Sequence, residues 1–225
     1  MSNITTTPSS SVPTPAHLEK FFARIDPVRA RLIFALDATA SRQPTWDTAA
    51  QLQGEMFATV AANGNLDVQL VYFRGYGECV ASRWLSDAAS LAAVMSRIDC
   101  RAGHTQIKKV LTHARREHAR EKIGALVVVS DACEEVPADL YAEAHELGGV
   151  PVFMFQEGSN ESVAEVYGQI ARISGGAYCK FDSGAAQRLA DLLKAVAAFA
   201  AGGIQALADQ KTEAARLLLT QIKKD

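Results

Sequence analysis

The stretch Gly124-Ala-Leu-Val-Val-Val-Ser-Asp131 is a short apolar run that ends in a carboxylate. A continuous apolar run of this length, rich in valine, is typical of a strand buried on both faces of a parallel sheet. A second such run, Arg31-Leu-Ile-Phe-Ala-Leu-Asp37, lies nearer the N-terminus and also ends in an aspartate. The two runs predict buried strands whose carboxylates lie at one edge of a sheet, where α/β proteins bind ligands.

The rest of the chain alternates between strand patterns and helix patterns. Four more strands are expected at residues 67–73, 78–85, 150–156 and 176–182. Helices are expected at residues 45–62, 87–98, 105–120, 140–147, 163–173 and 185–200, with Ser86 as the N-cap of the second. This alternation predicts an α/β fold: a doubly wound, mostly parallel sheet with helices on both faces, three layers in all, and one short antiparallel edge strand at residues 78–85.

Three segments are predicted along the chain. Residues 1–16 are rich in Ser, Thr and Pro and are expected to be a disordered tail, because they cannot bury enough apolar surface to offset ordering. Residues 17–201 form the α/β domain. Residues 202–225 are expected to form a separate helix after Gly202-Gly203, either docking on a partner or packing on the domain itself. Its seam consists of Ile204, Ala208, Lys211, Ala215, Leu218 and Ile222.

Composition excludes several classes of function. The chain has 225 residues, of which 48% are hydrophobic and 21% charged, as in ordinary globular domains. A net charge of -2 and a pI of about 6.2 argue against a nucleic-acid binder or an anionic-membrane binder. No export signal and no uninterrupted apolar stretch of membrane-spanning length are recognised, and the four cysteines form no CxxC pair. A cytoplasmic protein with reduced thiols and no membrane contact is therefore expected.

Hard oxygen donors gather where the predicted strands end. Asp37 and Asp131 close two strands, Thr39 and Ser41 follow the first aspartate, and Thr105 opens a helix at the same sheet edge. Carboxylates and hydroxyls without any thiol or imidazole suit Mg²⁺, with Mn²⁺ or Ca²⁺ as less selective occupants. The sequence thus predicts a divalent metal site made by these five residues.

The pattern Asp37-x-Thr39-x-Ser41, followed by a separate Thr105 and a separate Asp131, resembles the metal-ion-dependent adhesion site (MIDAS) of von Willebrand factor type A (VWA) domains. The order of strands and helices between residues 30 and 200 is similar as well. Two positions depart from the family pattern. Thr39 stands where a serine is usual, and Ala132 stands where a glycine usually follows the second aspartate.

The resemblance implies how such a site works. In the family, hydroxyls at the positions of Thr39, Ser41 and Thr105 bind the ion directly, and the aspartates often act through water. Neutral direct ligands leave the positive charge of the ion poorly neutralised. An open coordination position then attracts a carboxylate from a partner. Thr105 would join the site only in the binding-competent state.

Three hypotheses of function follow. The first is a non-enzymatic, metal-dependent protein-binding module that recognises an Asp or Glu of a partner, acting as an adaptor in a complex that includes an AAA-type ATPase, as the resemblance implies. The second is an Mg²⁺-dependent phosphotransfer enzyme with Asp37 as the nucleophile, although Thr39 stands where a phosphatase of that type needs a second aspartate. The third is a metal-free scaffold that acts through the C-terminal helix.

Overall fold

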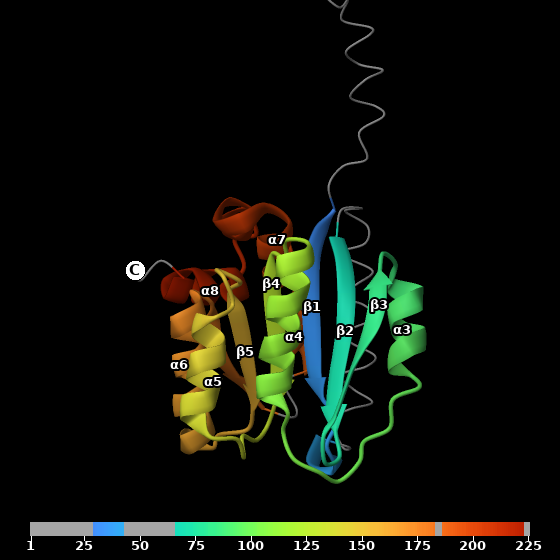
Figure 1. Cartoon of the computed structure of the whole chain (residues 1–225). Helices are drawn as coiled ribbons and strands as arrows, with labels where there is room; N and C mark the ends of the chain where they lie inside the picture. Colours follow the sequence, from blue (N-terminus) through green and yellow to red (C-terminus); the bar gives the residue numbers. More distant parts are fainter. Residues whose placement is uncertain (1–28, 43–65, 183–185, 223–225) are drawn as a thin grey trace, which may run out of the picture.

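Six strands form one mixed sheet in the order β3-β2-β1-β4-β5-β6 (Figure 1). The computed structural model describes residues 29–42, 66–182 and 186–222. All neighbours are parallel except β2 and β3, which are antiparallel. The predicted sheet with one antiparallel edge strand is therefore confirmed. The strands are β1 (Ala30–Asp37), β2 (Leu66–Arg74), β3 (Glu78–Leu85), β4 (Ala125–Ser130), β5 (Val152–Glu157) and β6 (Ala177–Phe181).

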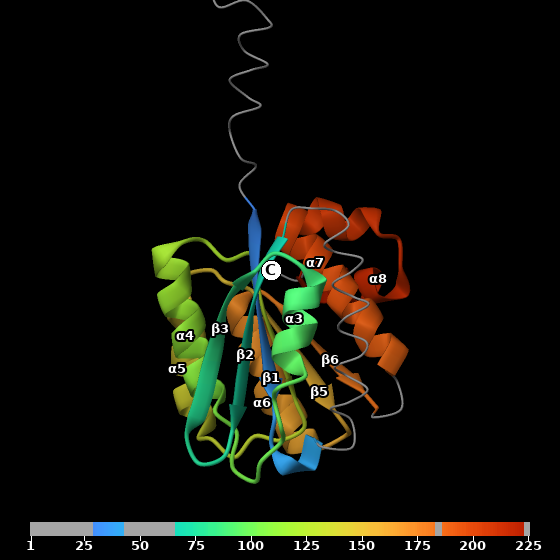
Figure 2. The same ribbon diagram turned by 90° about the vertical axis from the view of Figure 1, so that its right-hand side faces the viewer.

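Helices cover both faces of the sheet and make two separate cores (Figures 1 and 2). One face packs against α4 (Ile107–Arg120), α5 (Pro137–His145) and α6 (Glu161–Ser174). The other packs against α3 (Ala88–Met95), α7 (Ala186–Asp209) and α8 (Glu213–Ile222). A short 3₁₀ helix, η1 (Ala40–Arg42), follows β1 at the end of the sheet. The three-layer arrangement predicted from the alternating pattern is thus observed.

The central strands β1 and β4 explain why the apolar runs are continuous. In β1, Leu32, Phe34 and Leu36 point into one core, whereas Ile33 and Ala35 point into the other. A strand between two helix layers has no solvent-facing side, so every position is apolar until the strand ends. Asp37, the first polar side chain after this apolar run, therefore marks the end of β1.

One local expectation is wrong, and two others concern residues that the structure does not describe. The N-cap of α3 is Asp87 and not Ser86, because the Asp87 carboxylate accepts a hydrogen bond from the backbone of Ser90 (2.8 Å), whereas the Ser86 hydroxyl donates to Asp67 (2.8 Å). The helix expected at residues 45–62 and the tail at residues 1–16 lie outside the described residues.

The C-terminal segment forms two helical pieces where one was expected. The chain kinks at Gly202 and Gly203 but stays helical to the end of α7, and Lys211, with φ of 53°, lies in the turn before α8. Leu207 and Leu218 are fully buried in the core on that face of the sheet. The C-terminal helix therefore packs on its own domain.

By length and composition, α7 is the one described helix that could cross a membrane, with a mean hydropathy of 1.3 over its most apolar window. The core helix of a globular domain has the same composition. In α7, Leu189, Leu192 and Val196 are buried against the sheet. These apolar side chains of α7 thus pack within the domain.

Candidate functional site

The end of β1 places Asp37 beside the end of β4. The parallel register pairs Leu36 with Val129, so that Asp37 and Ser130 come next along the two strands. Asp37 is fully buried, and its carboxylate accepts hydrogen bonds from the Ser130 hydroxyl (2.6 Å) and the Thr39 backbone N–H (2.8 Å). Burial raises the pKa of Asp37, and these hydrogen bonds oppose the rise. The carboxylate is thus held in one orientation.

The hydroxyls of Thr39 and Ser41 lie together after this aspartate. Their oxygens are 3.1 Å apart, and the Thr39 backbone is fixed by the hydrogen bond to Asp37. The turn that leads into η1 is closed by the Arg42 backbone N–H, which donates to the carbonyl of Thr39 (3.0 Å). Asp37, Thr39 and Ser41 therefore form one cluster of oxygens.

Asp131 joins this cluster from the end of β4. It directly follows Ser130, whose hydroxyl donates to Asp37 (2.6 Å), and its charge contributes to the raised pKa of Asp37. The Oδ1 atom of Asp131 is buried and has no hydrogen-bond partner among the described residues. The following loop is held by the Tyr167 hydroxyl, which donates to the carbonyl of Ala132 (2.5 Å). Asp131 thus presents an unsatisfied buried oxygen from a fixed loop.

Thr105 lies at the same edge of the sheet but is engaged elsewhere. Its backbone N–H and its hydroxyl both donate to the Glu134 carboxylate, at 3.0 and 2.8 Å. No hydrogen bond joins Thr105 to the other four predicted ligands in the part of the chain that the structure describes. Thr105 is not an N-cap either, because α4 begins after Gln106 and its first N–H groups are bound by Glu135 from the same loop as Glu134.

A buried arginine completes the cluster. Arg42 is 1% exposed and forms an ion pair with Glu157 at the end of β5. Burial lowers the pKa of Arg42, and the charges of Asp37 and Asp131 raise it. A guanidinium stays protonated in proteins, so a fixed positive charge lies beside the two aspartates. Arg42 therefore neutralises part of the negative charge of Asp37 and Asp131.

The residues present fit a hard divalent cation. The donor set is made of oxygens, and one buried carboxylate oxygen of Asp131 has no partner among the described residues. Buried carboxylate oxygens are costly when unpaired, and a cation satisfies them. Asp37, Thr39, Ser41 and Asp131 would hold the ion, whereas Thr105 would first have to leave Glu134.

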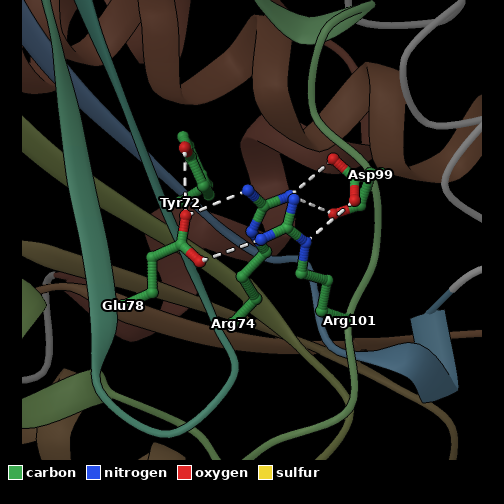
Figure 3. A network of polar contacts seen from close by, with 5 residues as sticks. All are labelled: Tyr72, Arg74, Glu78, Asp99 and Arg101. Atoms are coloured by element: carbon green, nitrogen blue, oxygen red, sulfur yellow. Dashed lines mark hydrogen bonds and ion pairs between the residues drawn. The ribbon is translucent and has the colours of Figure 1, made fainter.

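A polar network supports the chain beside Thr39 (Figure 3). The buried Arg74 side chain, at the end of β2, donates to Glu78 (3.0 Å) and to the backbone and side chain of Asp99, and Arg101 also binds Asp99 (2.9 Å). The Arg101 backbone in turn pairs with that of Thr39 in a parallel bridge. Arg74 therefore positions the segment that supports the hydroxyl cluster.

The Arg74→Gln variant is expected to be less stable than the wild type at neutral pH. Its stability should also fall less steeply than that of the wild type as the pH is lowered. Hydrogen bonds from Arg101 and Arg74 lower the pKa of Asp99 from its ordinary 3.8 to about 2, and Arg74 also lowers the pKa of Glu78. Carboxylates with lowered pKa values stabilise the fold above their ordinary pKa and lose that contribution as the pH falls towards the folded value. Urea unfolding from pH 7 to pH 2 measures both effects.

The difference between Arg74→Gln and the wild type should shrink as the pH falls towards 2. It should persist down to about pH 2, because the Asp99 carboxylate of the wild type stays ionised until then. The matched control is Arg97→Gln, which removes an exposed cation that forms no ion pair among the described residues. A variant whose acid unfolding matches that of the wild type would contradict the role given to Arg74.

Comparisons with solved protein structures support the fold. No protein-family model and no curated protein sequence matches the chain. Among solved structures, the SpRpn10 VWA domain matches with a TM-score of 0.56 and 10% identity, over 72% of this chain and 95% of that one. This chain has the VWA fold. An aerotolerance-related membrane protein from Bacteroides fragilis NCTC 9343 also matches, with a TM-score of 0.56 and 21% identity over 73% and 98% of the two chains.

A third match shows the VWA fold as one part of a larger protein. The pilus adhesin SpaC from Lactobacillus rhamnosus GG matches with a TM-score of 0.60 and 9% identity, over 75% of this chain but only 30% of the adhesin. All three identities are low, so the likeness concerns the fold alone. The candidate site therefore has to be judged on the residues of this chain.

Sequence reasoning missed four participants in the site. These are Ser130, Arg42, Tyr167 and Glu134. For Ser130 a signal existed, since it is the polar residue that ends the apolar run of β4, and parallel pairing places it beside Asp37. Arg42 and Glu134 carried no such signal, because charged residues in loops are usually solvated.

Proposed function

We propose that this chain is a non-enzymatic protein-binding module that holds Mg²⁺ at the end of its sheet and binds a carboxylate of a partner protein there. The observation that carries the proposal is the buried Asp131 oxygen without a partner among the described residues, beside the Asp37, Thr39 and Ser41 oxygens. Mn²⁺ or Ca²⁺ would fit the same donors less selectively.

Each side chain of the site has a separate role. Ser130 and the backbone of Thr39 orient Asp37, and Tyr167 fixes the loop of Asp131. Arg42, buried and paired with Glu157, offsets part of the negative charge of Asp37 and Asp131. When bound, the ion supplies an open coordination position for that carboxylate. Release of Thr105 from Glu134 would supply a further hydroxyl.

Exposed apolar side chains at the same edge suit a protein partner. Tyr76 is 84% exposed in the turn between β2 and β3, and its ring packs edge-on against His104, next to Thr105. Val136, after Glu135, is 63% exposed. Aromatic and apolar residues beside a polar centre are typical of the energetically important part of a protein interface.

The burial of Asp37 argues against a phosphotransfer enzyme. A nucleophilic carboxylate needs an oxygen that a substrate can reach. Asp37 is fully buried, and its two oxygens accept hydrogen bonds from Thr39 and Ser130. The metal-free scaffold is disfavoured as well, because α8 packs on its own domain through Ala215 and Leu218. A binding role at the sheet edge therefore remains the best supported function.

Capture of partners from the native cell tests the proposal. The tagged full chain is expected to retain a partner in Mg²⁺ and to release it in EDTA, in keeping with a cytoplasmic adaptor. A AAA-type ATPase among the retained proteins would support the adaptor role within an ATPase complex. The matched control is Asp87→Asn, which changes a carboxylate far from the site at a position where asparagine caps equally well. A partner retained equally in Mg²⁺ and in EDTA would refute metal dependence.

A further inference from the structure

A groove of about 490 Å³ lies between α4 and the edge strand β3, on the face of the sheet that α4, α5 and α6 cover. Its floor is made by Val71 of β2 and by Cys79 and Ala81 of β3. β3 stands at the edge of the sheet beside α4 (Figure 2). Small side chains on an edge strand therefore leave an open apolar floor next to the helix.

One stripe of α4 forms the opposite wall. Lys109, Thr112, His113 and Arg116 all line the groove, and their spacing of three, four and seven residues places them on one side of the helix. The adjacent stripe, which includes Val110 and Leu111, is buried on the sheet. α4 thus presents an apolar stripe to the core and a cationic stripe to the groove.

Two positive charges in the groove are not balanced by carboxylates of the described residues. Lys109 donates to the carbonyl of Gly77 (2.7 Å), and Arg116 is exposed and forms no ion pair in the described ranges. Lys108 is paired with Asp139 (2.9 Å). Glu135, the one carboxylate among the described lining residues, binds the first N–H groups of α4. The groove therefore carries a net positive charge.

The spacing of these charges suits an extended chain. Lys109 and Arg116 are seven residues apart, which is about 10 Å along a helix. In an extended segment, side chains two or four residues apart share a face and lie about 7 or 13 Å apart. Carboxylates at those positions bracket the distance, and long Lys and Arg side chains adjust to it. An apolar side chain between them would lie on the floor.

We propose that this groove binds an extended acidic segment of a partner protein, with Asp or Glu at alternate positions and small apolar residues between them. The acidic charge complements Lys109 and Arg116, and the apolar residues cover Val71, Cys79 and Ala81. The site uses none of the candidate metal ligands. It therefore stands or falls separately from the metal-dependent function.

The test uses a fluorescein-labelled peptide of alternating glutamate and valine and the full chain, measured by fluorescence anisotropy at low ionic strength. Lys109→Glu combined with Arg116→Glu is expected to weaken binding at least about tenfold, because like charges then face each other. The matched control, Arg97→Glu with Lys122→Glu, makes the same change in net charge at exposed residues outside the groove and should bind as the wild type does.

Three results would overturn the proposal. The first is that the groove variant and the control variant lose the same amount of affinity for the acidic peptide. The second is that a peptide of alternating lysine and valine binds the wild type as tightly as the acidic peptide does. The third is that millimolar inorganic phosphate displaces the acidic peptide. If charge reversal disturbs folding, as judged by circular dichroism, Lys109→Gln with Arg116→Gln replaces it and should weaken binding less. Peptide binding is expected to persist in EDTA and in Asp37→Asn, so failure of the metal site and failure of the groove are distinguishable.

Discussion

Replacing Asp37 by asparagine is expected to lower the affinity of this protein for Mg²⁺ by about 10- to 100-fold, the usual effect of removing a group that orients metal ligands or their water. The fold should persist without metal. Burial already raises the pKa of Asp37, which means that the buried site disfavours its charge. An asparagine amide can still accept the hydrogen bond from Thr39.

Thermal unfolding with increasing Mg²⁺ measures this effect. A ligand that binds only the folded state stabilises it by about 2.7 kcal/mol at a concentration 100 times its Kd. The wild type and the Asp87→Asn control should therefore gain in Tm as Mg²⁺ rises, and Asp37→Asn should gain little at the same concentrations. An equal rise in all three proteins would place the metal elsewhere in this fold, and no rise in any of them would mean that Mg²⁺ does not bind.

Replacing Gly103 by alanine is expected to disturb the same edge of the sheet through a steric clash. A Cβ atom at Gly103 would lie 2.1 Å from the carbonyl oxygen of Gly75, in the turn between β2 and β3. Backbone atoms cannot rotate away as a flexible side chain does, so the segment must shift. Overpacking of this kind costs about 1–3 kcal/mol. The segment that moves carries His104 and Thr105.

Urea unfolding and calorimetric titration with Mg²⁺ would separate the two consequences of Gly103→Ala. Stability should fall, and Mg²⁺ affinity should fall with it by about 10-fold if the Thr105 position matters to the site. Gly168→Ala is the matched control, because a Cβ there has no neighbour within 4 Å and alanine favours the interior of α6 by about 1 kcal/mol. A Gly103→Ala protein as stable as the wild type would contradict the close contact.

The strands and the two aspartates were predictable because burial on both faces leaves a strong pattern. In β1 and β4 the apolar run continues until the strand leaves the helix layers, and the first polar residues, Asp37 and Ser130, mark that point. Parallel neighbours then bring these ends together at one edge. The fold and the cluster of Asp37, Thr39 and Ser41 followed from this reasoning.

The side-chain partners of the site were not predictable in the same way. Glu134 binds Thr105, and Arg42 pairs with Glu157, through loops whose paths depend on tertiary packing and not on local pattern. The sequence left two packing arrangements open for the C-terminal helix for a related reason. Its apolar stripe is the same for a docking helix and for one packed on its own sheet, and only the structure shows Leu218 in the domain core.

The position of α8 affects how readily the protein associates with itself at high concentration. The side-chain amide of Gln221 accepts from the backbone N–H of Tyr178 in β6 (2.9 Å) and donates to its carbonyl (2.9 Å). These are the two bonds that a seventh strand would make at that residue, so glutamine takes the place of a strand at an exposed rim. Gln221 thereby occupies the backbone groups that another chain would need at Tyr178, which disfavours self-association by strand pairing at β6.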